Sequence, residues 1–236
     1  MDLLELKPIA YIRTDFPEKF GIPRQSGIIP ELKGKIVFEP EYRDANALRG
    51  IESYTHLWLI WGFSANKAQE KWEPTVRPPR LGGNTRVGVF ATRSPYRPNP
   101  LGLTVVKLEA VENAVNEGTV LVVSGTDMMD GTPIYDIKPY LPYVDSVPEA
   151  SDGFALARKE GTLSICFTDE ARSVISDEEA VILTKILEQD PRPQYQDEPD
   201  RIYRMDFRNY EVAFKISDKN ATVFEIKKKR RGQAEK

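Results

Sequence analysis

The chain has 236 residues with a net charge of −3; 40% are apolar and 10% aromatic, which suits one large globular domain or a domain with a small appendage. No apolar run approaches the ~20 residues that cross a bilayer, and the N-terminus lacks the pattern of a signal peptide, so we expect a cytoplasmic protein. The single cysteine, Cys166, excludes an intrachain disulfide, and with the single histidine, His56, it argues against a transition-metal site.

Up to residue 150 the pattern is one of many short apolar segments separated by turn residues. The run 56–61 is apolar on both faces, which predicts a central strand, and His56 within it is expected to be a hydrogen-bonded core residue rather than a catalyst. Helical periodicity is limited to a turn at 44–50 and another at 64–71. A mainly β fold follows, with a many-stranded sheet that is closed as a barrel or sandwiched. Strands are expected at 9–12, 35–38, 56–61, 86–91, 103–108 and 119–124.

Residues 142–153 are rich in Pro, Ser, Asp and Glu and are typical of a connector. A smaller α+β unit follows. Ser176 with Glu179 forms a capping-box signature, and the apolar spacing after it predicts a helix to about Gln189. Strands are expected at 162–167, 202–207, 211–216 and 222–226, the last two joined by a turn at 218–220.

Charge is distributed unevenly along the chain. Residues 71–107 hold seven basic side chains against one acid, whereas residues 169–200 hold ten acids against three bases. The C-terminus carries a further basic run at 227–231. Affinity for nucleic acid depends on local charge, so the acidic total does not exclude an RNA partner.

The segment 80–103 is the first candidate site. It holds Arg80, Arg86, Arg93 and Arg97 without an acid, beside three prolines and four glycines. Guanidinium groups on a backbone fixed by turn residues are suited to holding an anionic ligand. The alternative is a solvated basic loop beside a strand, and charge alone does not decide between the two.

Two further loops carry candidate chemistry. Arg24 and Gln25 lie in a Pro- and Gly-rich loop at 21–27, and Asp127 and Asp130 lie in a loop that follows the strand 119–124. Each loop alone also fits an ordinary turn. Together with the arginines they supply groups for a carboxylate or phosphate, acids for a ribose or cation, and nearby tyrosines for stacking a base. A nucleotide-like ligand is indicated, although no phosphate-binding glycine motif is present.

Read in order, these motifs resemble the TsaA-like family (TrmO, formerly YaeB). The resemblance is dense over about residues 5–147 and thinner through 190–195 (DPRPQY). The matching motifs are 20–27 (FGIPRQSG), 56–58 (HLW), 77–84 (RPPRLGGN), 88–94 (GVFATRS), 97–102 (RPNPLG), 130–133 (DGTP) and 136–142 (DIKPYLP).

The resemblance implies an S-adenosylmethionine-dependent tRNA methyltransferase that modifies N6 of threonylcarbamoyl-adenosine beside the anticodon of threonine tRNA. It also implies a β-barrel fold and a homodimer with the cofactor near the subunit interface. Ser64-Ala65 replaces bulkier polar residues common in relatives. The implied cofactor contacts are Pro23, Arg24, Gln25, Ser64, Ala65, Arg93, Leu103, Asp127, Met128, Met129 and Asp130.

The resemblance assigns no residue to deprotonation of N6, and the residues themselves leave that role open. Because the dense motifs end near 147, we expect cofactor binding in a barrel domain at 1–148 and tRNA docking in a small α+β domain at 149–236. The basic run at 227–231 either assists docking or is a solvated tail. The competing functions are a non-catalytic RNA-binding module and a nucleotide hydrolase.

Overall fold

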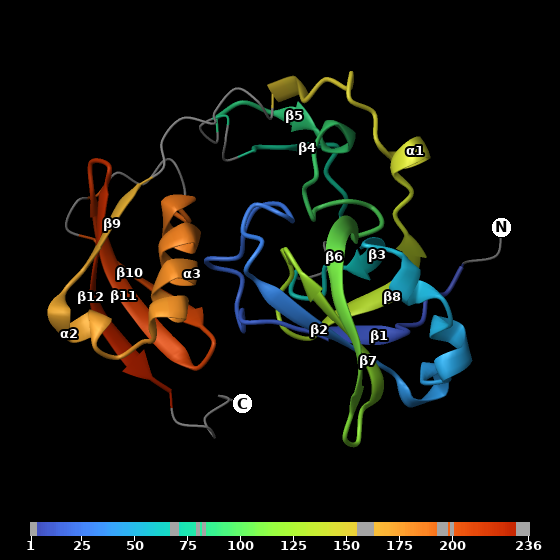
Figure 1. The fold of residues 1–236 in the computed structure, drawn as a ribbon. Coiled ribbons are helices and arrows are strands. Elements are labelled where there is room, and N and C mark those ends of the chain that lie inside the picture. Colours follow the sequence, from blue (N-terminus) through green and yellow to red (C-terminus); the bar gives the residue numbers. More distant parts are fainter. Residues whose placement is uncertain are drawn as a thin grey trace.

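The computed structural model describes residues 4–66, 71–78, 81, 84–154, 163–192, 198 and 201–229, and Figure 1 shows its fold. The expected mainly β class is confirmed. Six antiparallel strands close into a barrel in the order β1-β2-β7-β6-β3-β8. They are β1 (Ala10–Arg13), β2 (Lys33–Phe38), β3 (His56–Gly62), β6 (Leu101–Ala114), β7 (Gly118–Ser124) and β8 (Thr132–Pro139).

The central position expected for the 56–61 run is confirmed, because β3 pairs with both β6 and β8. Alternate residues of β3 are fully buried, among them Leu57 and Leu59. They pack in the barrel core with Ile12, Ile36 and Leu121 from three other strands. This period of two places one side of each strand inside the barrel and leaves the other toward solvent or loops.

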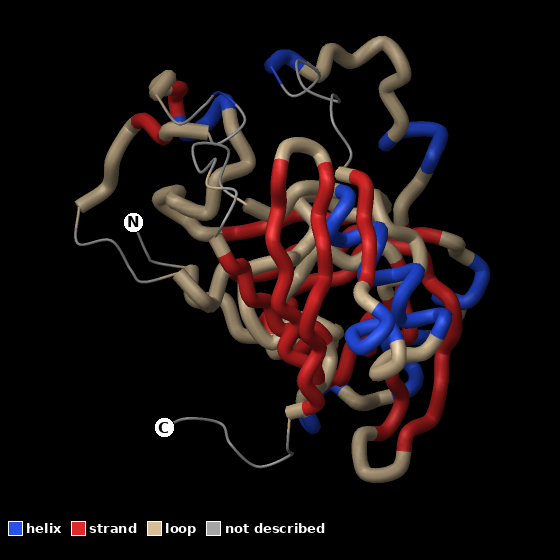
Figure 2. Tube along the Cα trace, turned by 90° about the vertical axis from the view of Figure 1, so that its left-hand side faces the viewer, coloured by secondary structure: helices blue, strands red, loops and turns tan. Residues whose placement is uncertain are grey.

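The C-terminal unit is a second layer of sheet and helix. Its strands pair in the order β10-β11-β12-β9, with β9 parallel to β12. Ser176 and Glu179 form the expected capping box at the start of α3. The elements are β9 (Ser164–Phe167), α2 (Asp169–Arg172), α3 (Asp177–Glu188), β10 (Ile202–Phe207), β11 (Tyr210–Ser217) and β12 (Asn220–Lys228). Figure 2 views the molecule from the side of this unit.

Short elements occupy the connections. Figures 1 and 2 both show β4 and β5 on a segment that projects beyond the barrel. No helix within the described residues has both the length and the apolar character to cross a membrane. The short elements are the 3₁₀ helices η1 (Pro40–Tyr42), η2 (Ala45–Leu48), η3 (Ile51–Ser53) and η5 (Val89–Ala91), the strands β4 (Thr75–Val76) and β5 (Val87–Gly88), and the helix α1 (Pro142–Asp145).

Two stretches differ from the sequence expectation. The predicted strand at 86–91 is wrong beyond Gly88, because the chain turns into η5 and only Val87 and Gly88 pair, with β4. Strand β8 was not expected, since a proline lies near each of its ends and such prolines ordinarily mark loops. The helical turn expected at 64–71 falls largely outside the described residues, as do Arg80 and part of the 190–195 motif.

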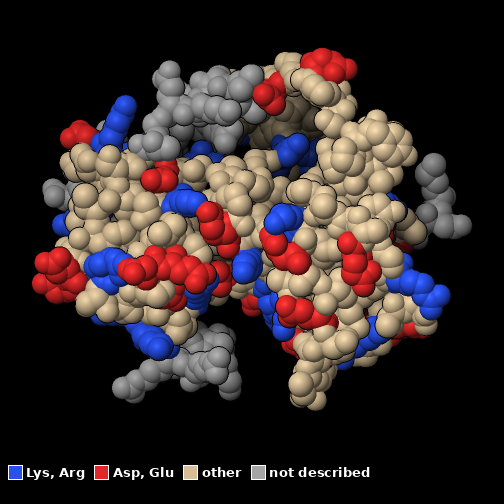
Figure 3. All heavy atoms as spheres, viewed as in Figure 1, with Lys and Arg blue, Asp and Glu red and all other residues tan. Residues whose placement is uncertain are grey.

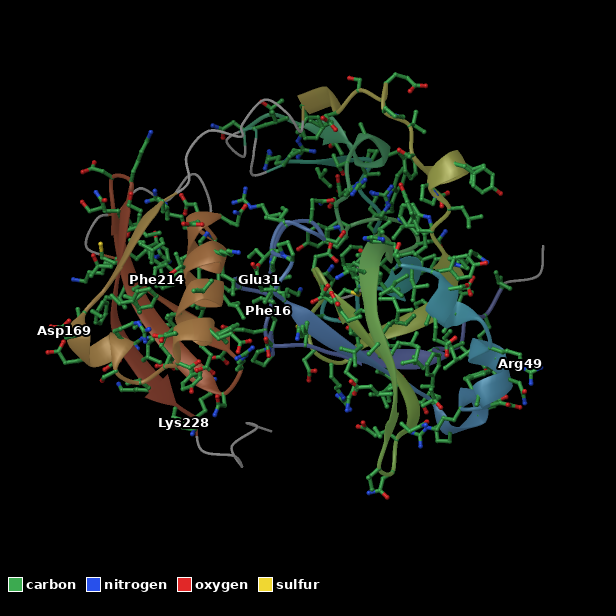
Figure 4. All side chains as sticks on the ribbon, viewed as in Figure 1. Phe16, Glu31, Arg49, Asp169, Phe214 and Lys228 are labelled. Carbon is green, nitrogen blue, oxygen red and sulfur yellow. The ribbon has the colours of Figure 1, made fainter. Side chains whose placement is uncertain are left out.

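The described residues form two hydrophobic cores, and one of them combines residues from both halves of the chain. One fills the barrel. The other fills the C-terminal unit but also contains Phe16, Ile29 and Leu32, which belong to the β1–β2 connection. Figure 4 shows Phe16 on the side of the barrel that faces this unit, whose interior holds Phe214. The β1–β2 connection is therefore shared between the barrel and the C-terminal unit.

Candidate functional site

The three candidate loops leave the barrel at the same end. They are the β1–β2 connection (14–32), the β3–β6 connection (63–100) and the β7–β8 connection (125–131). The register explains the convergence: Ile12 pairs with Thr132 at the start of β8, Gly62 pairs with Leu101, and Lys33 pairs with Ser124. Loops that are about 100 residues apart in sequence therefore emerge side by side.

A close backbone contact joins the first loop to the third. The Gly27 N–H donates to the Gly125 carbonyl at 2.9 Å, and the Gly125 N–H donates to the Leu32 carbonyl at 2.8 Å. Both glycines have a φ of +74°, and a Cβ on Gly125 would lie 3.2 Å from backbone atoms of Gly27. Glycine is required at Gly125 by both its conformation and its neighbour.

Asp127 is the most enclosed acid of the site. Its Oδ1 accepts a hydrogen bond from the Thr104 hydroxyl at 3.1 Å, and that hydroxyl in turn accepts one from the Trp61 indole N–H at 3.0 Å. Burial raises the pKa of Asp127 above its ordinary value, although Thr104, the backbone N–H groups of Asp127 and Ser26, and the charge of Arg93 act to lower it. The carboxylate is thus held by a chain of donors that begins in the barrel wall.

Arg93 reaches across from the second loop to the first. It donates a hydrogen bond to the Gln25 side-chain oxygen, and the Gln25 amide donates to the Arg24 carbonyl at 2.6 Å. Arg24 donates to the Asp190 carbonyl of the C-terminal unit at 3.0 Å. Guanidinium and amide groups are thereby arranged around the mouth of the site.

Asp130 ties the third loop to the first. Its side chain accepts from the Thr14 N–H at 3.0 Å, while its own N–H donates to the Phe16 carbonyl at 2.7 Å. The Thr14 hydroxyl donates to the Met128 carbonyl at 3.0 Å, and Arg13 lies 3.7 Å from the Asp130 carboxylate. Asp130 therefore organises the base of both loops, as capping acids do.

The eleven residues implied by the resemblance differ in their burial and in their contacts. Contacts link Gln25, Arg93 and Asp127 across the three loops. The side chains of Pro23 and Met128 are buried in the fold, Met128 within the barrel core. Arg24, Ser64, Ala65 and Leu103 are exposed, and Met129 and Asp130 are half-buried. The side chains of Pro23 and Met128 are therefore turned away from a ligand, and the Met128 carbonyl accepts from the Thr14 hydroxyl.

Sequence reasoning missed two polar side chains, Thr104 and Thr14, and one main-chain donor, the Ser26 N–H, that build the site. Thr104 is 4% exposed and joins Trp61 to Asp127. Thr14 and Ser26 hold the first loop onto the third. The only sequence signal for Thr104 is a lone hydroxyl in the apolar strand at 103–108, which has to find a partner when it is buried.

A row of exposed aromatic and basic side chains lies along the β3–β6 connection. Phe90 is 72% exposed, with the Trp72 ring 6.1 Å away and the Arg97 guanidinium 5.9 Å above it. Arg97 is fixed by donating to the Thr92 carbonyl at 2.7 Å, and Tyr96 is 48% exposed. Figure 3 shows Lys and Arg atoms at the floor of the hollow beneath this projecting segment. We call Trp72, Phe90, Tyr96 and Arg97 the aromatic row.

A separate cavity of about 440 Å³ lies away from these loops and contains none of the implied residues. It is lined by Lys7, Pro8, Tyr11, Glu39, Pro40, Glu41 and Tyr42. Within the described residues, no cluster of three or more His, Cys, Asp or Glu side chains is placed to hold a metal ion. His56 contacts the Thr55 hydroxyl through Nδ1 at 3.0 Å and is half-buried.

Comparison with known proteins identifies the family of this chain. The model of the tRNA-methyltransferase O N-terminal domain matches residues 11–146, and that of the TrmO C-terminal domain matches residues 160–229. The chain belongs to the tRNA-methyltransferase O family. Apart from Ala10, the two matches together cover both hydrophobic cores.

Two relatives and a solved structure are similar to this chain over most of its length. The tRNA (adenine(37)-N6)-methyltransferase of Escherichia coli is 36% identical over 234 residues, which cover 96% of this chain and 99% of that protein. The enzyme of the same name from Eikenella corrodens is 45% identical over 172 residues, covering 72% and 96%. The crystal structure of TrmO from Pseudomonas aeruginosa superposes with a TM-score of 0.78 at 32% identity, covering 97% of this chain and 98% of that one.

Proposed function

We propose that this chain transfers a methyl group from S-adenosylmethionine to N6 of adenine 37 of tRNA, acting on threonylcarbamoyl-adenosine beside the anticodon of threonine tRNA. The observation that carries the proposal is family membership over both halves of the chain, with relatives that are named for this reaction. The convergence of three loops at one barrel end supplies a place for the reaction.

The cofactor would lie among the residues of the three loops. Gln25, Arg93 and Asp127 would contact it by side chain, and Pro23 and Met128 by main chain, since their side chains are buried. The remaining implied residues would surround the cofactor. They are Arg24, Ser64, Ala65, Leu103, Met129 and Asp130.

The chemistry of this donor set fits the cofactor. S-adenosylmethionine carries a carboxylate, which a guanidinium such as Arg93 binds, and ammonium and ribose hydroxyl groups, which a carboxylate such as Asp127 binds. S-adenosylmethionine supplies an electrophilic methyl group, and the role of the chain is to hold the cofactor and the adenine N6 in line.

The aromatic row would receive the RNA. Unpaired bases of an anticodon loop stack on exposed aromatic rings, and arginine side chains contact phosphates and rings. Phe90 and Arg97 offer both within the connection that also carries Arg93. The row would therefore be positioned to receive a nucleotide beside the methylated base.

Three further assignments complete the proposal. Residues 1–148 would form the barrel domain and residues 149–236 the smaller domain, which would assist tRNA docking. The protein would act as a homodimer with the cofactor near the interface. Work on tRNA would place it in the cytoplasm.

The test is methyl transfer to purified threonine tRNA carrying threonylcarbamoyl-adenosine. Mass spectrometry of the digested nucleosides is expected to show a gain of one methyl group that depends on S-adenosylmethionine and is reduced in Arg93→Ala. A protein that binds tRNA but neither binds S-adenosylmethionine in calorimetry nor changes the nucleoside mass would instead be a non-catalytic RNA-binding module.

A further inference from the structure

We propose that the C-terminal unit is the platform that positions the cofactor loop, with Arg208 as the positioning residue that joins the two. The cofactor loop here means residues 23–27 at the tip of the β1–β2 connection. The inference rests on the proposed function, because it takes these residues as part of the S-adenosylmethionine site. It differs from a role confined to tRNA docking, since it makes cofactor affinity depend on residues beyond 200.

Apolar side chains anchor the connection in the second core. Phe16, Ile29 and Leu32 are at most 1% exposed, and all three are buried among residues of α3 and the C-terminal sheet. The Phe16 and Phe207 rings lie 6.3 Å apart, and the Phe20 ring stacks on Phe214 at 6.4 Å. The connection thus packs as part of the C-terminal unit on both sides of its tip.

The connection also approaches the C-terminal unit closely at Gly21. Gly21 has a φ of +93°, and a Cβ there would lie 2.4 Å from the end of the Met205 side chain. Pro23, two residues later, is buried. The chain entering the cofactor loop therefore lies against the Met205 side chain of β10 (Ile202–Phe207), and the positive φ of Gly21 favours glycine there.

Arg208 holds the base of the connection through three contacts. The main-chain N–H of Arg208 donates to the Asp15 carbonyl at 2.8 Å. Its guanidinium lies 3.1 Å from the Asp15 carboxylate and 3.3 Å from that of Glu179 on α3. Burial raises the pKa of Asp15 while Arg208 lowers it, so without Arg208 the carboxylate would be left buried beside the charge of Glu179.

The other end of the connection is also pinned to this unit. Arg24 donates to the Asp190 carbonyl, and Lys185 of α3 forms an ion pair with Glu31. Between these points the tip faces the barrel, where Gln25 accepts from Arg93 and the Ser26 N–H donates to Asp127. The cofactor loop therefore bridges two bodies, and its position depends on the C-terminal one.

The experiment compares two arginines of the same unit in the full chain. Arg208→Met removes the ion pairs with the Asp15 and Glu179 carboxylates and keeps the main-chain hydrogen bond to the Asp15 carbonyl. Arg204→Met is the matched control, because the ion pairs that Arg204 makes among the described residues lie within the C-terminal sheet, with Glu211 at 3.1 Å and Glu225 at 3.3 Å. The measurements are the Kd of S-adenosylmethionine by calorimetry, the KM and kcat of methyl transfer, and the Tm of each variant.

We expect Arg208→Met to weaken S-adenosylmethionine binding about tenfold and to raise its KM more than it lowers kcat. Arg204→Met is expected to keep wild-type affinity at a comparable Tm, and Arg208→Lys to recover part of the loss. Equal affinities in Arg208→Met, Arg204→Met and wild type would overturn the inference and leave the proposed function intact. A wild-type protein that does not bind S-adenosylmethionine would overturn the proposed function itself.

A charge exchange keeps the test decisive if Arg208→Met does not fold. Lys185 and Glu31 are both partly exposed, so substitution at either is tolerated by the core. Lys185→Glu is expected to weaken S-adenosylmethionine binding, and Glu31→Lys combined with it is expected to restore the affinity. Unchanged affinity in Lys185→Glu, or no recovery in the double variant, would contradict the platform role.

Discussion

Asp127 combines burial with a fixed set of donors, and its ionisation is therefore coupled to the stability of the fold. Because burial raises its folded-state pKa above the ordinary 3.8, the fold favours the protonated form. The stability that this preference contributes is fully present below the unfolded pKa and is lost as the pH rises through the folded pKa. Asp127 therefore contributes less to the stability of the fold at neutral pH than it does in acid.

Asp127→Asn is expected to abolish most S-adenosylmethionine binding while raising the Tm relative to wild type as the pH increases from about 4 to 7. The amide oxygen can still accept from Thr104, but it has no charge to bury. Scanning calorimetry across this pH range tests whether the Tm of Asp127→Asn rises relative to that of the wild type. The control is Glu112→Gln, an exposed carboxylate on β6, for which the Tm difference should not vary in the same way. A variant that is least stable at neutral pH would contradict the account.

At the scale of elements, the sequence predicted most of the strands because their apolar residues alternate or run continuously. The strand expected at 202–207 matches β10 (Ile202–Phe207), and the helix after Ser176 was fixed by its capping box. Strand β8 was missed because Pro133 and Pro139 resemble loop residues, although Pro133 pairs with Tyr11 in the barrel. Local pattern cannot reveal a pairing whose partner lies more than 100 residues away.

The loops of the site could be predicted from the sequence, but the residues that hold those loops in place could not. Glycines, prolines and arginines marked the segments that hold Gln25, Arg93 and Asp127, because those residue types are needed for turns and anions. Thr104 carries no such mark, and its role depends on the register that brings it opposite Leu59 and beside Asp127. The sharing of Phe16 with the second core was likewise invisible, since a buried phenylalanine fits either core.

The glycine contact between the first and third loops gives a prediction at this scale. Gly125→Ala should destabilise the protein by about 1–3 kcal/mol and weaken S-adenosylmethionine binding, because the added Cβ meets Gly27 in a strained backbone region. Gly131→Ala is the matched control: it has the same φ of +74° but nothing within 4 Å of its Cβ. Urea unfolding measures the difference, and equal losses would mean that the Gly27 contact contributes nothing.

The aromatic row on the β3–β6 connection gives a second prediction at the scale of elements. Phe90→Ala is expected to weaken tRNA binding by about 1–3 kcal/mol, the range for loss of one stacked base, and to leave S-adenosylmethionine binding unchanged. Tyr143→Ala, which removes an 83% exposed ring on α1, is the control and should bind as wild type. Filter binding with unmodified and modified tRNA measures the affinities. If Phe90→Ala changes the mass in sedimentation but not tRNA affinity, the row covers a second copy of the chain instead.

At the scale of the whole molecule, the charged C-terminal run is partly built into the sheet. Lys227 lies 2.8 Å from Glu225, and Lys229 forms an ion pair with Asp206. Lys227 and Lys228 belong to β12, whereas residues 230 and 231 lie outside the described residues. The first part of the run is therefore structural, and a tRNA contact by the run would have to accommodate these pairs.

The shared core predicts how the chain responds to division. A fragment of residues 1–148 would expose Phe16, Ile29 and Leu32, which are at most 1% exposed in the full chain. Each loses about 1.5–3 kcal/mol of apolar burial, a large part of the stability of a domain. We expect the fragment to aggregate or to bind S-adenosylmethionine at least tenfold more weakly than the full chain, as measured by calorimetry.

The control retains both units and breaks only the covalent link. A protease site placed between residues 154 and 163, followed by cleavage, should leave the two pieces associated and the affinity for S-adenosylmethionine unchanged, because the contacts through Phe16 and Arg208 persist. Size-exclusion chromatography confirms the association. If the isolated fragment 1–148 binds as tightly as the cleaved pair, the barrel and its loops are self-sufficient, and the C-terminal unit serves the tRNA alone.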